Sequence, residues 1–334
     1  MSTTICTSVQ GIGLGIMGQF IARHVPEITK IIGVRRSPGS GAEDLEFPDR
    51  PMLVYDIEIP PEALSYLYND KYLYIESSYG LSPYMAAGQR LYVPMWEQGS
   101  TSAECVFQPH TIAVTRHTED VMRQLGARRV TYLPWPVGVP ESARVVHAVR
   151  TIVHNAGSLG GNLRKGTPAA IRIFQKSGVA ARGVRLVVHS WLAPPPEIAA
   201  IIAEAPDNIE WTGRFAPSVA DIYEGGDLLL MPSKIEGHAL CALEAMASGM
   251  VVLATDSAPI NEYEDDRAFL LPVSACAPSP LAAPYSLVDE AAGADCLRAL
   301  CERDVSERSK SGREQVVREY SWAAVGDRWR ELCA

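Results

Sequence analysis

Long uncharged apolar runs are missing from this 334-residue sequence, and no stretch approaches the roughly 20 residues that a transmembrane helix needs. The N-terminus carries no basic region ahead of its apolar stretch, which glycines interrupt, so we expect no signal peptide. These absences favour a cytoplasmic protein without a membrane-spanning segment.

Paired metal-ligand motifs are missing as well. The seven cysteines are scattered without a CxxC pair, and the seven histidines show no HExxH spacing. We therefore expect reduced cysteines, no protein-held zinc and no tightly bound cofactor. A divalent metal is not expected to be required, although a loosely held ion stays open.

Positive charge is scarce overall but concentrated in one part of the chain. The net charge is −9, which disfavours nonspecific binding to nucleic acid or to an anionic membrane. Residues 116–185, however, hold 12 Lys/Arg against three acids, a local charge of +9. Either an anionic ligand or a solvated basic face would explain this segment.

With 47% apolar residues, the chain can bury the cores of two domains of about 150 residues each. Its first half alternates short β-prone runs with helical periods, which predicts a mostly parallel sheet. Residues 3–9 lead through a glycine-rich turn into a helical pattern at 16–25, and 117–127 form a second helical pattern. Further strand candidates are residues 31–36, 52–57, 71–78, 90–96 and 111–115.

The run YLPWPVGVP, residues 132–140, holds three prolines and suits an interdomain linker. The alternation then restarts, so we predict a second doubly wound domain with a ligand in the crevice between the two. The expected strands lie at 149–157, 184–190, 208–213, 227–233 and 250–256, and the expected helices at 168–178, 196–205 and 240–248. The periodicity weakens at 273–287, for which we predict no placement, and a helical tail starts near Asp289.

Residues 231–263 carry the most informative chemistry. A strand ends in a loop with Glu236 and Gly237, and a helix begins near Ala239 with Glu244 inside it. The small residues let a diphosphate approach the free amides at the helix N-terminus, where the helix dipole favours anions. We expect Glu244 to accept both hydroxyls of a ribose and Glu236 to face the group beyond the diphosphate.

This segment resembles the donor site of the family-four retaining glycosyltransferases of GT-B fold, glycosyl transferases group 1. Their signature is two glutamates separated by seven residues, as Glu236 and Glu244 are, and the surrounding EGHALCALEAMASGMVVLAT follows the family closely. The resemblance implies that Glu236 lies against the donor sugar and that Glu244 binds the ribose. It also implies phosphate binding by the amides of His238, Ala239 and Leu240. The alternative is that both acids are solvated and flank an amphipathic helix.

A glycine-rich loop in HNAGSLGGNLRKGTPAAIRIF, residues 154–174, is a second match. The family uses an arginine just after the strand and a lysine before a glycine to neutralise the donor diphosphate. Lys165 fits the lysine, whereas Ser158 stands at the arginine position, and Arg164 is the candidate replacement. An exposed basic turn is the alternative. The resemblance extends to 115–140 and 320–332 and is weak in the first 100 residues.

The resemblance sets the domain boundaries that we predict. Residues 1–140 would form a Rossmann-like acceptor-side domain and 141–315 a Rossmann-like nucleotide-sugar-binding domain. Residues 316–334 would form a C-terminal helix that packs back toward the first domain.

GIGLGIMG contains a dinucleotide-type fingerprint, Gly13-x-Gly15-x-x-Gly18. An NAD site needs an acidic residue about 20 positions on, but the second expected strand ends in Arg35 and Arg36, which suit only a 2′-phosphate. An NAD(P)-dependent oxidoreductase therefore stays as an alternative. In the GT-B interpretation, Gly13 and Gly15 border the acceptor cleft and the donor phosphates.

Four residues are candidates for the acceptor side. Trp96 and Glu97 follow an expected strand. The Trp96 ring would serve as a platform for the acceptor, and the Glu97 carboxylate would bind an acceptor hydroxyl. Arg116 and His117 lie at the start of an expected helix. Core packing for Trp96 and a solvated loop position for Glu97 are equally open.

The resulting prediction is a retaining transfer of sugar from a nucleotide-diphosphate sugar to an acceptor hydroxyl of a glycan, lipid or small molecule. A UDP-sugar is favoured and a GDP- or ADP-sugar possible. Charge develops on the leaving diphosphate, so Lys165 and Arg164, together with Glu236 at the sugar, are the expected catalytic residues. Alternatives are a DNA glycosyltransferase of the phage type, which acts on hydroxymethylated pyrimidines through residues 116–185, and a noncatalytic sugar-nucleotide binding protein.

Overall fold

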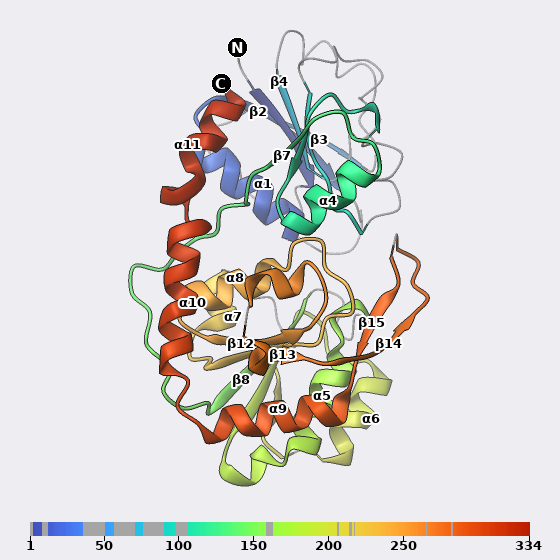
Figure 1. The fold of residues 1–334 in the computed structure, drawn as a ribbon, viewed down its shortest axis with the longest axis vertical. Coiled ribbons are helices and arrows are strands. Elements are labelled where there is room, and N and C mark those ends of the chain that lie inside the picture. Colours follow the sequence, from blue (N-terminus) through green and yellow to red (C-terminus); the bar gives the residue numbers. More distant parts are fainter. Residues whose placement is uncertain are drawn as a thin grey trace. The chain divides into compact units, whose positions relative to one another are not determined.

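Two units make up the chain, Met1–Trp135 with Val325–Ala334 and Pro136–Ala324 (Figure 1). The computed structural model describes residues 3–8, 13–35, 51–56, 71–75, 90–97, 106–157, 163–205, 207–213, 216, 218–264, 266–281 and 283–334.

Parallel strands form the sheet of the first unit in the order β3-β2-β1-β4-β5-β6-β7. The order reverses between β1 and β4, which is the topological switch point of a doubly wound sheet. The strands are β1 (Thr3–Ser8), β2 (Ile28–Arg35), β3 (Met52–Asp56), β4 (Lys71–Ile75), β5 (Arg90–Val93), β6 (Thr111–Ala113) and β7 (Val130–Tyr132). The expected strands of this half are confirmed, and β7 is an addition within what the sequence indicated as loop and linker.

Glycine permits the first helix, α1 (Gly13–His24), to approach β1 closely. A Cβ on Gly18 would lie 2.5 Å from Cγ2 of Thr7, so only glycine fits there. The helix α4 (Arg116–Gln124) begins at Thr115, whose hydroxyl accepts a hydrogen bond from the Thr118 amide at 2.9 Å.

The last helix, α11 (Trp322–Cys333), completes the core of the first unit. The Trp329 indole donates to the Pro134 carbonyl at 2.9 Å, and its ring meets the Trp135 ring edge-on at 4.9 Å between centroids. The Thr3 hydroxyl donates to the Cys333 carbonyl at 2.5 Å. Both tryptophans are fully buried, so residues far apart in the chain share one core.

The second unit has a parallel sheet in the order β10-β9-β8-β11-β12-β13. Its strands are β8 (Thr151–Gly157), β9 (Arg185–Ser190), β10 (Ile209–Trp211), β11 (Leu228–Met231), β12 (Val251–Thr255) and β13 (Leu270–Leu271). The helices are α5 (Thr167–Ser177), α6 (Pro196–Glu204), α7 (Val219–Tyr223), α8 (Leu240–Ala247), α9 (Glu290–Glu302) and α10 (Ser306–Glu319), with the 3-10 turns η4 (Leu163–Lys165), η5 (Val179–Arg182), η6 (Ile260–Tyr263) and η7 (Arg267–Phe269).

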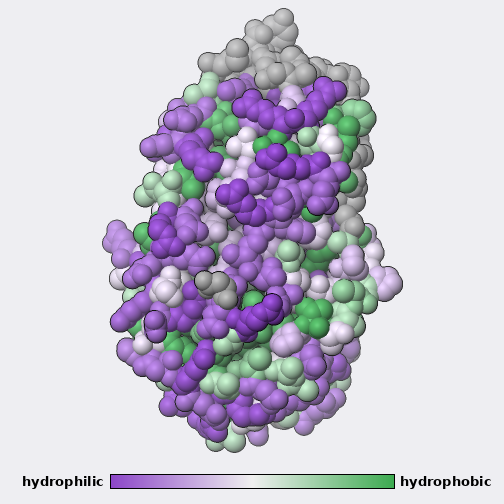
Figure 2. All heavy atoms as spheres, viewed as in Figure 1, coloured by the Kyte–Doolittle hydropathy of each residue, from purple (hydrophilic) through white to green (hydrophobic). Residues whose placement is uncertain are grey.

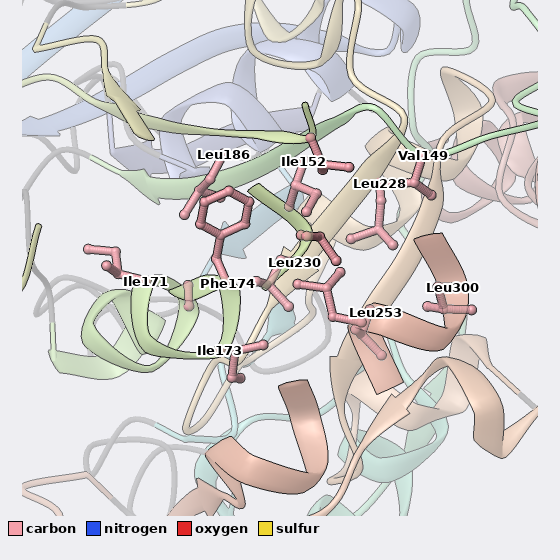
Figure 3. Packing of buried hydrophobic residues seen from close by; sticks show 14 of the residues in the cluster. Val149, Ile152, Ile171, Ile173, Phe174, Leu186, Leu228, Leu230, Leu253 and Leu300 are labelled. Carbon is pink, nitrogen blue, oxygen red and sulfur yellow. The ribbon is translucent and has the colours of Figure 1, made fainter. Parts of the chain in front are cut away.

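Alternation along the central strands divides the core of this unit between the two faces of the sheet. Leu228 and Leu230 of β11 pack with α5, α6 and α9, whereas Leu229 and Met231 pack with α7, α8 and α10. Figure 3 shows the first of these layers, in which Phe174 of α5 lies beside Leu186 of β9 and near Leu230. Helices therefore cover both faces, as in a doubly wound fold.

The Pro/Ala/Ser-rich run that had no predicted placement forms an antiparallel pair, β14 (Val273–Ala277) and β15 (Tyr285–Val288). The Ser286 amide donates to the Lys234 carbonyl at 2.8 Å, which ties this hairpin to the loop after β11. Pairing with a distant loop leaves no periodic pattern in the sequence, so the run was not recognisable as strands.

Polar side chains cover most of the coloured surface in Figure 2, and the apolar ones form small groups between them. Among the helices of the described ranges, none is long and apolar enough to cross a membrane.

Gly166, which precedes α5, brings two loops of the second unit together. Its φ is +69°, and a Cβ there would lie 2.0 Å from the Pro232 carbonyl oxygen. Gly178, which follows α5, also has a φ of +69°, but nothing lies within 4 Å of its Cβ position. The two glycines therefore share one backbone conformation and differ in the space beside it.

We expect Gly166→Ala to lower the free energy of unfolding by at least about 2 kcal/mol more than Gly178→Ala, which bears only the left-handed backbone cost of about 1–2 kcal/mol. Urea unfolding of the two variants measures the difference. Equal losses would show that the Pro232 loop gives way to the added methyl group.

Candidate donor site

The loop that follows β11 is held from both sides before it reaches Glu236. The Thr255 hydroxyl donates to the Ser233 carbonyl at 2.8 Å, and the Lys234 amide donates to the Arg164 carbonyl at 2.8 Å. The second bond joins this loop to η4, which follows the neighbouring strand β8. The carboxyl ends of adjacent parallel strands thus bring Glu236, Arg164 and Lys165 together.

Glu236 is 4% exposed and forms a buried ion pair. Its Oε1 lies 2.8 Å from Nζ of Lys165, and its Oε2 lies 3.8 Å from a guanidinium nitrogen of Arg164. Burial alone would raise the pKa of Glu236, but Lys165 and Arg164 outweigh burial and lower it. In the same way burial would lower the pKa of Lys165, and Glu236 raises it instead. Both groups therefore stay charged at neutral pH.

The start of α8 presents backbone amides without a side-chain cap. Ala239, the N-cap residue, has φ 58° and ψ 38°, a left-handed conformation that is strained for alanine. Within the described ranges, the amides of Leu240 and Cys241 have no hydrogen-bond partner, as expected for the first turn of a helix. Such amides, with the positive end of the helix dipole, form an anion site.

Glu244 lies one turn further along α8 and is partly buried. The Tyr223 hydroxyl donates to its Oε2 at 3.1 Å. Burial raises the pKa of Glu244 to about 7, although the Tyr223 hydrogen bond and Lys165 act in the opposite direction. The carboxylate thus changes its charge near neutral pH.

His238 is 4% exposed, and neither of its ring nitrogens has a hydrogen-bond partner among the described residues. Burial lowers its pKa to about 4, so the ring is neutral at pH 7. The Tyr263 hydroxyl donates to the His238 carbonyl at 2.7 Å, which fixes the backbone rather than the ring.

The second unit therefore gathers most of the predicted donor-site residues. Glu236, Gly237, His238, Ala239 and Leu240 form the loop and helix start, with Glu244 in the helix and Arg164 and Lys165 on η4. Ser158 lies outside the described residues. No three His, Cys, Asp or Glu side chains gather as metal ligands in the part of the chain that is described.

The residues predicted for the acceptor side belong to the first unit. Trp96 and Glu97 are buried, at 9% and 2% exposure, and the Trp96 ring meets the His117 ring edge-on at 4.3 Å. Arg116 lies over the Tyr132 ring and pairs with Glu119 at 2.9 Å. The structure brings Trp96 and His117 together and buries Trp96, whereas a sugar platform needs an exposed ring. Their acceptor role stays a prediction.

The glycines of the fingerprint open α1, with Gly13 and Gly15 in its first turn and Gly18 against β1. The residues between β1 and this helix lie outside the described ranges. Arg35 ends β2, where a dinucleotide site needs an acidic residue.

The basic excess at residues 116–185 is largely neutralised in the fold. Nine of its twelve Lys/Arg form ion pairs, most of them with acids from later in the chain: Arg116 and Arg123 with Glu119, Arg144 with Asp227, Arg164 and Lys165 with Glu236, Arg172 and Lys176 with Glu290, Arg182 with Glu302, and Arg185 with Glu210. The segment also divides between the two units. A count along the chain missed these partners, and the folded segment lends no support to DNA binding.

Residues 150–283, which contain this site, match the family of glycosyl transferases group 1. A curated relative in sequence is the lipopolysaccharide 1,2-N-acetylglucosaminetransferase of Salmonella typhimurium, 30% identical over 127 residues. The match spans 37% of this chain and 30% of that protein.

Solved structures show that this chain has the GT-B fold. HepE of Anabaena, in complex with UDP, matches 99% of each chain with a TM-score of 0.70 and 11% identity. A glycosyltransferase from Rickettsia africae matches 99% of this chain and 98% of its own with a TM-score of 0.67 and 12% identity. TarM of S. aureus has a TM-score of 0.64 and 15% identity, and this chain covers 58% of it. The prediction of two Rossmann-like domains is confirmed.

Sequence reasoning missed three residues of this site. Tyr223 contacts Glu244, and the side-chain amide of Asn155 donates from Nδ2 to the Cys241 sulfur at 3.6 Å. Asn155 lies within residues 154–174 and Cys241 within residues 231–263, the two segments that resemble the family. A polar side chain in each segment was the available signal. Tyr223 lies 21 positions before Glu244 in an unremarkable short helix, so only the fold reveals it.

The buried pair predicts a strong dependence of stability on its partner. We expect Lys165→Met to lower the free energy of unfolding by about 3–5 kcal/mol, since it leaves the buried Glu236 charge without its nearest partner. Adding Glu236→Gln should recover much of the loss. Lys176→Met is the matched control, because its 2.6 Å pair with Glu290 is half exposed and contributes about 0–1 kcal/mol. Urea unfolding at pH 7.5 measures the three variants and the unmodified protein, and equal losses for both lysines would contradict the buried pair.

The raised pKa of Glu244 predicts a second, pH-dependent effect. The native state takes up a proton at Glu244 below about pH 7, whereas the unfolded state does so near 4.5, so Glu244 makes unfolding easier as pH rises through this window. We expect Glu244→Gln to raise the Tm of the ligand-free protein by about 2–4 °C at pH 8 and to leave it unchanged at pH 4. Thermal unfolding at both pH values checks this, and an identical Tm at pH 8 would show that Glu244 titrates normally.

Proposed function

We propose that this chain is a retaining glycosyltransferase that moves a sugar from a nucleotide-diphosphate sugar, most readily a UDP-sugar, to an acceptor hydroxyl. The observation that carries the proposal is the convergence, at one edge of the second sheet, of two cations, two glutamates and an uncapped helix start. Two similarities support the proposal. The segment of this chain that matches the Salmonella N-acetylglucosaminetransferase spans under a third of that protein. Two of the structural neighbours, TarM and HepE, were solved with UDP.

Each group at the site then has a distinct task. The amides of Leu240 and Cys241 bind the diphosphate, whose charge Lys165 and Arg164 neutralise. Glu244 accepts hydrogen bonds from the ribose hydroxyls. Glu236 contacts the donor sugar, and in the ligand-free state it holds Lys165 in place by the 2.8 Å ion pair. The diphosphate therefore meets a lysine that is already positioned.

The reaction needs no protein nucleophile. The bond between the anomeric carbon and the diphosphate oxygen breaks, and the acceptor oxygen bonds to the same face of that carbon. The acceptor proton passes to the leaving phosphate oxygen. Because the diphosphate gains negative charge in the transition state, the buried cations stabilise it more than they stabilise the ground state. A glycan, lipid or small molecule is the proposed acceptor.

The test uses a panel of UDP-, GDP- and ADP-sugars, with and without hydroxymethylated DNA, and measures released nucleotide. We expect release with a UDP-sugar and, for Glu244→Ala, a donor KM raised roughly 10- to 100-fold, since hydrogen bonds to a charged acceptor are lost. Glu210→Ala, which removes an exposed acid of β10, is the control and should match the unmodified protein.

Stimulation by the DNA would replace the proposed acceptor with a modified base. Binding of nucleotide-sugars without any release would indicate a noncatalytic binding protein. Absence of both binding and release would overturn the proposal, and binding of a nicotinamide cofactor would then be measured.

A further inference from the structure

Tyr223 makes a contact with the donor site that lies outside the glutamate signature. It is the last residue of α7, is 2% exposed, and donates from its hydroxyl to Oε2 of Glu244 at 3.1 Å. We propose that Tyr223 is a positioning residue for nucleotide binding, which orients Glu244 and favours the carboxylate that accepts the ribose hydroxyls. This inference rests on the proposed function of the donor site.

The position of Tyr223 is set by its own surroundings. A capping box at Ser218 and Asp221 fixes the start of α7, with the Ser218 amide donating to the Asp221 carboxylate at 2.8 Å. The Tyr223 carbonyl accepts from the Gly226 amide at 3.0 Å, which closes the turn into β11. The tyrosine ring packs in the apolar layer beneath α8. The Tyr223 hydroxyl therefore reaches Glu244 from a backbone that α7 and the turn into β11 hold in place. The hydroxyl is the polar end of an otherwise apolar side chain.

The hydroxyl acts as a donor throughout the working pH range. Burial raises the pKa of Tyr223 well above its usual value, and the nearby Cys241 and Glu244 raise it further. A tyrosine that keeps its proton stabilises the carboxylate of Glu244 more than the carboxylic acid, because a charged acceptor forms the stronger hydrogen bond.

The charge of Glu244 is balanced between opposing neighbours. Burial favours the neutral acid, while Tyr223 from α7 and Lys165 from η4 favour the carboxylate. Cys241, on the preceding turn of α8, is a neutral thiol whose pKa burial raises. Lys165 is shared with Glu236 at 2.8 Å and is also the expected partner of the diphosphate. Tyr223 is thus the neighbour whose contact with Glu244 is direct.

The experiment measures UDP affinity by calorimetry from pH 5.5 to 8.5 for the unmodified protein, Tyr223→Phe, Glu244→Gln and Tyr320→Phe. Unmodified protein should lose affinity as pH falls through about 7, when Glu244 becomes protonated. For Tyr223→Phe we expect the midpoint of this loss to rise by about one pH unit, equivalent to about 1.4 kcal/mol. Glu244→Gln should bind weakly at every pH.

Tyr320→Phe is the matched control, because it removes another buried tyrosine hydroxyl of the same unit that does not contact Glu244. It should follow the unmodified profile. If the unmodified protein binds UDP and folded Tyr223→Phe loses affinity at the same midpoint pH, the inference is overturned. The proposed function of the donor site would be unaffected by that result.

If the unmodified protein binds no nucleotide, the proposed function fails separately. The titration midpoint of Glu244 in the free protein then decides the positioning role. Carbon-13 NMR of the glutamate carboxyls measures this midpoint, and the Glu244 signal is identified because it is missing from the spectrum of Glu244→Gln. A midpoint equal in the unmodified protein and Tyr223→Phe would overturn the inference there too, and a rise of about one pH unit would support it.

Discussion

The ion pair between Glu236 and Lys165 is the constraint on which the donor site depends. Neither charge would be stable at that depth alone, because removal from water costs several kcal/mol per ion and only close mutual attraction offsets it. Each charge therefore needs the other, and the loops after β8 and β11 have to meet. Two features let the loops meet. Gly166 has no side chain to collide with the Pro232 carbonyl, and the hydrogen bond from the Lys234 amide to the Arg164 carbonyl joins the two backbones.

Much of the fold could be predicted because parallel strands buried on both faces leave continuous apolar runs, such as LLLM in β11 and VVLAT in β12. The helix with Glu244 was recognisable for a local reason too, since small residues and a helix pattern follow a strand directly. Lys165 could be identified too, because it precedes a glycine in a loop that resembles the phosphate-binding loop of the family. These features depend on neighbours in sequence, where a pattern is visible.

What could not be predicted depends on partners that are distant in the chain. The hairpin of β14 and β15 is held by the loop at Lys234, and Tyr223 reaches Glu244 only because α7 and α8 pack on the same face of the sheet. The basic segment misled for the same reason, since Glu236, Glu290 and Glu302 neutralise it from 70 to 120 positions further on. Charge along a sequence describes a surface only when its partners are local.

The contact of Trp329 with Trp135 and Pro134 has a consequence for synthesis of the chain. These residues share one core, yet all of the second unit lies between them in the sequence. During translation the strands of the first unit leave the ribosome before the second unit, and the helix that completes their core leaves after it. The second unit can therefore fold while the first unit still lacks α11 and exposes apolar surface. During this interval a chaperone could bind that surface.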